Sequence, residues 1–188
     1  MISFSGMEGT KLNSPKIIEK RTFIDSRGYF QEVAKEGDDT FAGLGSIKQI
    51  NMSRSSAGVL RGIHAQKGMD KAMWVANGEA IIYAVLLDRD SAKFGTVVSE
   101  NLKAGDGKVF YAPHDWGRGF LAMKDNTVVV YACSDFYRPE AEYGINPLTC
   151  GLPSVNEEIA KHLVISDKDK QAISIKDFKE GKDGSEEA

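Results

Sequence analysis

Residues 58–66 read Gly58-Val59-Leu60-Arg61-Gly62-Ile63-His64-Ala65-Gln66, an apolar run that carries an arginine and a histidine three positions apart. In a regular β-strand, side chains at i and i+3 point to opposite faces, which would separate Arg61 from His64. Glycine inside a strand often marks a bulge or the close approach of another backbone. A bulge or close approach at Gly62 could therefore turn both polar side chains toward one cavity. The alternative is a partly exposed arginine and a histidine satisfied inside a β-core.

The residues around this stretch have the pattern of an all-β protein. Short apolar or alternating segments are broken by turn residues and are not separated by long helices, which favours a β-sandwich or barrel. Asn77-Gly78 lies between two apolar segments, and this dipeptide is typical of a β-hairpin. Asp25-Ser26-Arg27-Gly28 predicts another turn. The predicted strands are 17–23, 29–33, 47–53, 73–75, 80–87, 96–102, 108–112, 119–123 and 127–136.

The pattern changes near the C-terminal end of the sequence. Ser154 and Glu157 have capping-box spacing, and residues 158–164 can continue as a short helix. Ser166 stands in the same relation to Asp169, ahead of a second short helix at 170–173. The polar residues 1–15 predict a flexible arm, and the charged residues 179–188 predict a disordered tail. Between them, we expect one domain over residues 16–178.

Composition limits the classes of partner. The chain has 188 residues, of which 41% are hydrophobic and 27% are charged, and its formal net charge is -3. No basic cluster favours nucleic acid, although one or two arginines suffice for a small phosphate ligand. There is neither a secretory signal nor an apolar run long enough to cross a membrane, so we expect a cytoplasmic protein. Cys133 and Cys150 predict two reduced thiols.

Residues 58–66 resemble the "GVLRGLHYQ" signature of the dTDP-4-dehydrorhamnose 3,5-epimerase family. Further segments match the family in the same order, so that the resemblance extends over residues 20–177. It implies a cupin-type jelly-roll β-sandwich with short C-terminal helices. The other matching segments are 23–32, 91–95, 113–120, 131–145 and 166–169.

The resemblance also implies an activity. Members of this family are isomerases that epimerise a nucleotide-linked 4-keto-6-deoxy sugar at C3, at C5 or at both, in the synthesis of dTDP-rhamnose for lipopolysaccharide and other cell-surface polysaccharides. Removal of a proton beside the C4 ketone and its return from the opposite face require a base of near-neutral pKa, a proton donor and positive charge for the enolate oxygen. A homodimer is implied, and no cofactor is.

Four residues match catalytic positions of the family. His64 matches the base, and an unperturbed histidine titrates near ~6.5. Asp169 matches the carboxylate that holds the base, although its spacing from Ser166 is also that of a helix cap. Tyr131 matches the proton donor, although a tyrosine that closes a β-branched run is often simply core. Lys71 matches the lysine that polarises the substrate carbonyl, and is otherwise a solvated surface residue.

A second group of residues matches binding positions. Gln49 and Asn51 share one strand face, which borders either solvent or a wet cavity, and the resemblance favours the cavity. Arg61 offers a fork of donors to a diphosphate. Arg27, Phe30 and Glu32 match residues that in the family reach the nucleotide from the neighbouring subunit; the alternative is a surface ion pair between Arg27 and Glu32. The predicted substrate-binding residues are Arg27, Phe30, Glu32, Gln49, Asn51, Arg61, Arg118 and Tyr137.

The sequence departs from the family at Arg118, which stands where the family has a second active-site histidine. An arginine stays protonated, so it cannot shuttle a proton, but it could stabilise an enolate or grip an anion. A metal site is not expected, because the three histidines include no His-x-His pair. The alternatives to an epimerase are a related cupin ketoisomerase or dehydratase and a sugar-nucleotide-binding cupin without turnover.

Overall fold

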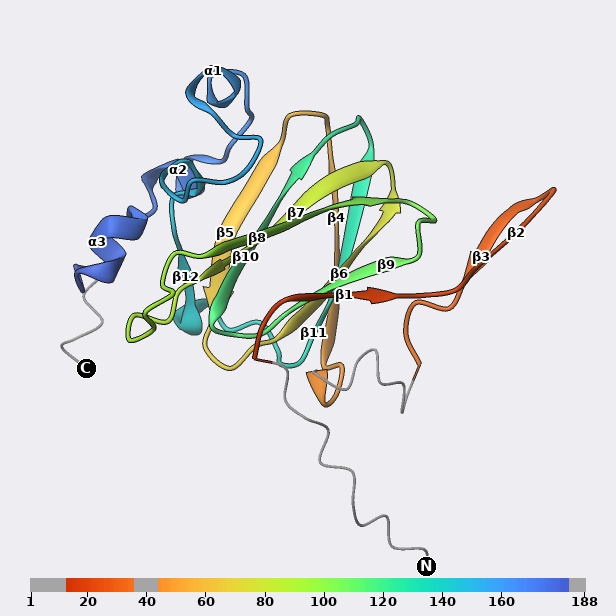
Figure 1. Cartoon of the computed structure of the whole chain (residues 1–188), viewed down its shortest axis with the longest axis horizontal. Coiled ribbons are helices and arrows are strands. Elements are labelled where there is room, and N and C mark those ends of the chain that lie inside the picture. The colour runs from red at the N-terminus through yellow and green to blue at the C-terminus, as the bar shows by residue number, and fades with distance from the viewer. Residues whose placement is uncertain (1–12, 36–43, 183–188) are drawn as a thin grey trace, which may run out of the picture.

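The structure is a computed structural model that describes residues 13–35 and 44–182. Within these residues, the strands form two five-stranded antiparallel sheets and a two-stranded hairpin. The sheets face each other as a sandwich, and the short helices lie together at one side of it (Figure 1). The predicted all-β class is confirmed. Most of the predicted arm and the last residues of the predicted tail lie outside the described residues.

Each sheet is built from strands that are distant in the sequence. The first sheet contains, in spatial order, β1 (Lys16–Glu19), β9 (Lys108–Ala112), β6 (Lys71–Asn77), β11 (Thr127–Cys133) and β4 (Gln49–Ser55). The second contains β12 (Glu142–Gly144), β5 (Leu60–Gln66), β10 (Trp116–Ala122), β7 (Glu79–Leu86) and β8 (Val97–Lys103). The hairpin consists of β2 (Thr22–Asp25) and β3 (Gly28–Gln31), around the turn predicted at residues 25–28.

The hairpin predicted at Asn77-Gly78 is wrong. β6 pairs with β9 and β11, whereas β7 pairs with β8 and β10, so the turn passes from one sheet to the other. Gly78 has a φ of +78°, and a Cβ added there would lie 2.5 Å from Thr127 Oγ1. Only glycine fits this turn. The dipeptide correctly marks a sharp change of direction, but strand pairing depends on which apolar faces are buried together.

The C-terminal helices are three in number within the described part of the chain; the first is shorter than predicted, and the second begins three residues earlier than predicted. They are α1 (Glu157–Ala160), α2 (Asp167–Gln171) and α3 (Ile175–Lys179), and two 3-10 turns, η2 (Pro139–Ala141) and η3 (Pro147–Thr149), precede them. The side chain of Asn156, not Ser154, caps α1. Ser166 caps α2 as its spacing predicts. The unpredicted α3 buries Phe178 against the second sheet, and it extends to Lys179, where the tail was predicted to begin.

Besides a smaller cluster on the first sheet that includes Tyr111 and Ala132, two apolar layers hold these elements in place. One lies between the sheets and includes Met73, Phe110 and Phe120, each at most 4% exposed. The other lies between the second sheet and the C-terminal segments, and includes Ile63 and Phe178. Because β5 borders both layers, it presents one set of side chains to the helices and the other to the space between the sheets.

Candidate active site

A cavity of about 490 Å³ lies where β5 and β10 of the second sheet face β6 and β11 of the first, beside α2. It contains all four residues predicted to be catalytic and two of those predicted to bind substrate. The predicted residues that line it are Arg61, His64, Lys71, Arg118, Tyr131 and Asp169.

A β-bulge in β5 explains why Arg61 and His64 share this cavity. His64 pairs with Arg118 of β10 and Arg61 pairs with Phe120, so one extra residue of β5 is accommodated between the two pairs. Gly62 lies within the bulge with a φ of +113°, and a Cβ there would lie 2.6 Å from the Cα atom of Gly119. The bulge predicted at Gly62 is confirmed, and no other residue type fits this close approach.

Asp169 lies against His64, with 2.6 Å between its Oδ1 atom and His64 Nε2. The backbone N–H of Asp169 also donates to Ser166 Oγ at 3.1 Å, so the residue belongs to a helix cap and to an imidazole–carboxylate pair at once. Burial opposes its ionisation, but hydrogen bonds from His64, Ser166 and the Gly62 backbone outweigh it and lower the pKa of Asp169. The ionised carboxylate engages Nε2, which leaves Nδ1 of His64 to exchange a proton.

Tyr131 and Lys71 approach the cavity from the opposite sheet. Burial raises the pKa of Tyr131, so the phenol is protonated at neutral pH. The Lys71 Nζ atom lies 5.3 Å from the centre of the Tyr131 ring. Burial, and then the charge of Arg118, lower the pKa of Lys71 to about 8. The cavity therefore holds an imidazole on one wall, and a phenol with a readily deprotonated ammonium group on the other.

Arg118 is 3% exposed, and backbone carbonyl oxygens accept hydrogen bonds from both terminal nitrogens of its guanidinium group. One terminal nitrogen donates to the carbonyl oxygens of Trp116 at 2.6 Å, Pro113 at 3.3 Å and His114 at 3.4 Å. The other donates to the carbonyl of Met69 at 3.0 Å. Nε is buried and has no hydrogen-bond partner among the described residues. Burial lowers the pKa of Arg118 to about 10, so the group remains a cation at neutral pH.

The other predicted binding residues near the cavity are fixed by polar contacts. Arg61 donates through Nε to Ser55 Oγ at 3.0 Å. Gln49 donates to Asn51 Oδ1 at 2.8 Å and accepts from the backbone N–H of Tyr137 at 2.8 Å. Gln49 and Asn51 are half-buried on the inward face of β4, next to Tyr131, but they do not line the cavity of this chain. Tyr137 is 48% exposed and lies outside it too.

Arg27, Phe30 and Glu32 lie on or just after the β2–β3 hairpin, which projects away from the sandwich (Figure 1). All three are exposed, and none lines this chain's cavity. Arg27 forms a 2.6 Å ion pair with Asp25, so the alternative pairing of Arg27 with Glu32 is wrong. The two residues belong to the same turn, in which Asp25 also accepts a hydrogen bond from the backbone N–H of Arg27.

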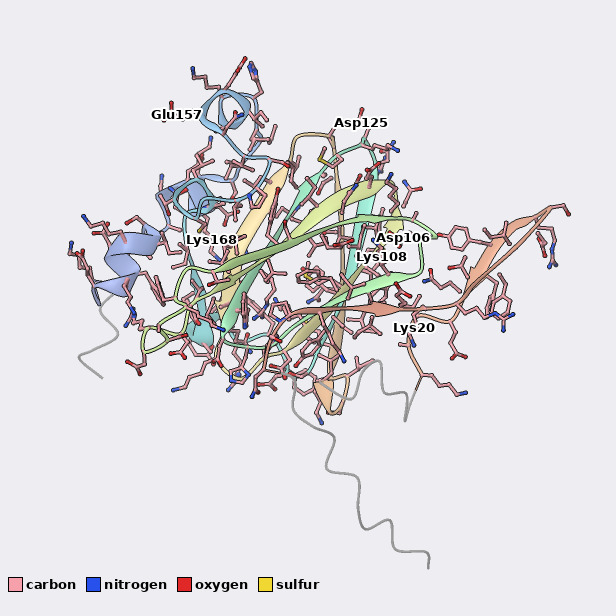
Figure 2. The ribbon with its side chains drawn as sticks, in the orientation of Figure 1. Lys20, Asp106, Lys108, Asp125, Glu157 and Lys168 are labelled. Atoms are coloured by element: carbon pink, nitrogen blue, oxygen red, sulfur yellow. The ribbon has the colours of Figure 1, made fainter. Side chains whose placement is uncertain are left out.

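Sequence reasoning missed Lys168 and Glu142. The Lys168 Nζ atom lies 2.6 Å from Glu142 Oε2, which also accepts from the Tyr137 hydroxyl at 3.1 Å. Lys168 lines the cavity and lies where the C-terminal helices meet the sandwich (Figure 2). Both residues stand inside matching segments, 166–169 and 131–145, but an isolated lysine and an isolated glutamate carry no chemical pattern. Only the fold brings them together.

Two classes of feature are not found in the described part of the chain. In residues 13–35 and 44–182, no group of three His, Cys, Asp or Glu side chains could hold a metal ion. His114 instead pairs with Asp70 at 2.9 Å, and His162 is exposed after α1. No helix in these same ranges is long and apolar enough to cross a membrane.

Comparison with known proteins places this site in a family. The family profile described as dTDP-4-dehydrorhamnose 3,5-epimerase matches residues 9–177. The epimerase of that name from Methanothermobacter thermautotrophicus is 34% identical over 168 residues, which cover 86% of this chain and 89% of the relative.

Solved structures agree with the sequence comparison. An epimerase from Legionella pneumophila in complex with dTDP-4-keto-L-rhamnose has a TM-score of 0.77 and 30% identity, with 89% of this chain and 90% of that one covered. ChmJ, a 3'-monoepimerase from Streptomyces bikiniensis in complex with dTDP-quinovose, has a TM-score of 0.76 and 27% identity, with 87% and 84% covered. The predicted cupin-type fold and isomerase class are confirmed. The chain belongs to the dTDP-4-dehydrorhamnose 3,5-epimerase family.

Proposed function

We propose that this chain epimerises a dTDP-linked 4-keto-6-deoxy sugar of the dTDP-4-dehydro-6-deoxyglucose type, at C3, at C5 or at both. One observation carries the proposal: His64, held by Asp169, and Tyr131 line one cavity from opposing sheets. Inversion at a carbon requires a proton to leave one face of the sugar and another to arrive at the opposite face. A base and an acid on two walls of one cavity suit this reaction, whereas a binding protein needs neither.

In the proposed reaction, the Nδ1 lone pair of His64 takes the proton from the carbon beside the ketone. Asp169 holds Nε2 at 2.6 Å and stabilises the imidazolium that forms. Lys71 supplies positive charge to the ketone oxygen as it becomes an enolate. The Tyr131 phenol then donates a proton to the carbon from the other wall.

Binding is assigned to the polar residues around this centre. Arg61, at the edge of the cavity, offers its remaining guanidinium donors to the diphosphate. Gln49 and Asn51, beside Tyr131, contact the nucleotide-sugar together with Tyr137, whose backbone is bonded to Gln49. Arg118 belongs to the cavity wall as well.

The active form that we propose is a homodimer. Trp74, Val130 and Met52 stand side by side across β6, β11 and β4 on the outer face of the first sheet. Met52 is 74% exposed, and on the hairpin Ile24 is 80% and Phe30 67% exposed. A contiguous apolar face of this kind is characteristic of a protein–protein interface. A second copy seated on it would bring Arg27, Phe30 and Glu32 toward the neighbouring site.

A charge on the edge strand β4 of that face tests the dimer. Met52→Asp is expected to convert a dimer into a monomer in light scattering coupled to size exclusion. Glu157→Lys on α1, on another side of the molecule (Figure 2), serves as the control and should leave the mass unchanged. A wild-type mass for Met52→Asp would contradict an interface on this face.

We also propose a cytoplasmic location and a role in deoxysugar synthesis for cell-surface polysaccharides. Cys133 and Cys150 are both free thiols, which agrees with a reducing compartment.

The experiment that tests the function is incorporation of solvent deuterium into dTDP-4-keto-6-deoxyglucose, followed by mass spectrometry and NMR. Two deuterons, at C3 and C5, would establish a 3,5-epimerase, and one would establish a single-site epimerase. His64→Asn and Tyr131→Phe should each lower the rate about 100-fold or more. His162→Asn, an exposed histidine, is the matched control and should incorporate deuterium like the wild type.

The other outcomes separate the alternatives. Binding without exchange, measured by calorimetry, would leave a sugar-nucleotide-binding cupin. Exchange that yields a product other than an epimer would indicate the ketoisomerase or dehydratase. Wild-type rates in His64→Asn would refute the assigned base.

A further inference from the structure

Arg118 is a buried cation without a carboxylate partner among the described residues. It is 3% exposed, and the atoms within hydrogen-bond distance of its guanidinium are four carbonyl oxygens. A buried charge is costly unless its surroundings compensate it. Carbonyl dipoles orient the group. The nearby Asp70 carboxylate, which bonds to His114, raises the pKa of Arg118 through its charge but forms no ion pair with it, so the guanidinium stays a cation in the wall of the cavity.

The carbonyls that bind Arg118 also connect it to Lys71. Met69, which accepts from one end of the guanidinium at 3.0 Å, lies two residues before Lys71 in the sequence. The opposite end is held by the turn at residues 113–116, between β9 and β10. Arg118 therefore fixes the start of β6, and its charge acts directly on the Lys71 ammonium group.

We propose that Arg118 is a positioning residue for Lys71, whose fixed charge and backbone bonds keep the Lys71 ammonium group poised for the oxygen that becomes negative when a proton is removed. This inference rests on the proposed function for the identity of that oxygen. Two like charges that line one cavity from opposing sheets repel each other until a negative charge develops in that cavity. The arrangement therefore favours the enolate over the neutral ketone, which is the difference that accelerates a reaction.

The other ionisable groups around Lys71 do not supply this effect. On β11, the Cys133 thiol is kept protonated, since burial raises its pKa, and Tyr131 is likewise a neutral phenol. Glu142 of β12 acts in the opposite direction and raises the pKa of Lys71. On β9, Ala112 stands opposite Lys71 and carries no charge.

The effects of burial and of Arg118 on Lys71 predict how turnover depends on pH. Burial and Arg118 together lower the pKa of Lys71 to about 8, so the ammonium group is lost as the pH rises through that value. If Lys71 must be protonated, turnover in the wild type should decline above about pH 8. Removal of the charge at 118 should move this decline to higher pH.

The test compares Arg118→Gln, which removes the charge, with Arg118→Lys. The lysine keeps the charge but lacks the two terminal guanidinium nitrogens that bond to the backbone carbonyls. In Arg118→Gln, the alkaline decline of kcat should move upward by about 1 pH unit, and kcat at pH 7 should fall about 10-fold or more, with KM nearly unchanged. In Arg118→Lys, the decline should stay near its wild-type position. A decline that does not move in Arg118→Gln, or that moves as far in Arg118→Lys, would overturn the inference. If Arg118→Gln does not fold, an upward shift of the decline in Arg118→Lys, which keeps the charge, would overturn the inference.

A second readout does not depend on turnover. Lysines labelled by reductive ¹³C-methylation are titrated by NMR, and the Lys71 resonance is identified by its loss in Lys71→Arg. Its midpoint should lie near 8 in the wild type and higher in Arg118→Gln. A shifted midpoint in a protein without epimerase activity would support the coupling and refute the proposed function. An unshifted midpoint in an active epimerase would refute the coupling between Arg118 and Lys71 and support the proposed function.

Discussion

Replacement of Asp169 by asparagine tests the geometry of the site with a change of a single atom. In the wild type, the carboxylate accepts from His64 Nε2 at 2.6 Å, and it also accepts from Ser166 and from the Gly62 backbone N–H. The amide oxygen of asparagine would stay on the Gly62 N–H, because that donor is buried in the bulge. The amide NH₂ group would then face His64 Nε2. Nε2 must become the acceptor, which places the imidazole proton on Nδ1.

A proton on Nδ1 removes the base from the atom that faces the substrate. General base catalysis contributes ~10²- to 10⁴-fold, so Asp169→Asn should lose ~3 to 5 kcal/mol of transition-state stabilisation. The fold should survive, because Ser166 Oγ still accepts a hydrogen bond from the backbone N–H of residue 169 and so still caps α2. The assay is the initial rate of solvent deuterium incorporation at saturating substrate, with substrate affinity measured separately.

Asp167→Asn is the matched control for this change. It removes the same charge from the first turn of the same helix, but Asp167 is exposed and does not contact His64. Its rate should be that of the wild type. If Asp169→Asn incorporates deuterium within about threefold of the wild-type rate, the carboxylate is not needed to hold the imidazole and the reasoning fails.

Three further predictions follow from the packing around the site. In Gly144→Ala, the new Cβ would lie 3.3 Å from His64 Cδ2, and the tilted imidazole should cost about tenfold in turnover at unchanged affinity by calorimetry. Gly62→Ala should destabilise the protein by about 3 kcal/mol in urea unfolding, since its φ is +113° and Gly119 blocks the Cβ; an unchanged midpoint would contradict this. The lowered pKa of Asp169 adds stability that is present above its unfolded value of about 3.9 and is lost as pH falls through the folded value. The deficit of Asp169→Asn in thermal unfolding should therefore shrink as the pH falls below about 3.9; a constant deficit would contradict it.

Features that depend on a few adjacent residues could be predicted from the sequence. The turn before Gly28, the cap at Ser166 and the bulge at Gly62 all follow from local backbone preferences. The number and spacing of short apolar segments indicated an all-β sandwich. The catalytic residues came from motif matches, because nothing in their spacing distinguishes a base from a core histidine.

The Asn77-Gly78 turn illustrates what local preferences leave open. Its sharp geometry was predicted correctly, but the strands that it joins lie in different sheets. The pairing of a strand is decided by the burial of its apolar face against partners that come later in the chain. For β6, these partners are β9 and β11.

The sequence by itself determined the fold class, the bulge that aims Arg61 and His64, and the residue types available for proton transfer. The tertiary structure alone decided that Asp169, 105 residues from His64, contacts its imidazole, that Lys168 meets Glu142, and that Arg118 is buried beside Lys71. The physical reason is one of range. Dihedral preferences act over a few residues, whereas hydrogen bonds between side chains and the effect of burial on a charge depend on which distant segments the folded sheets bring together.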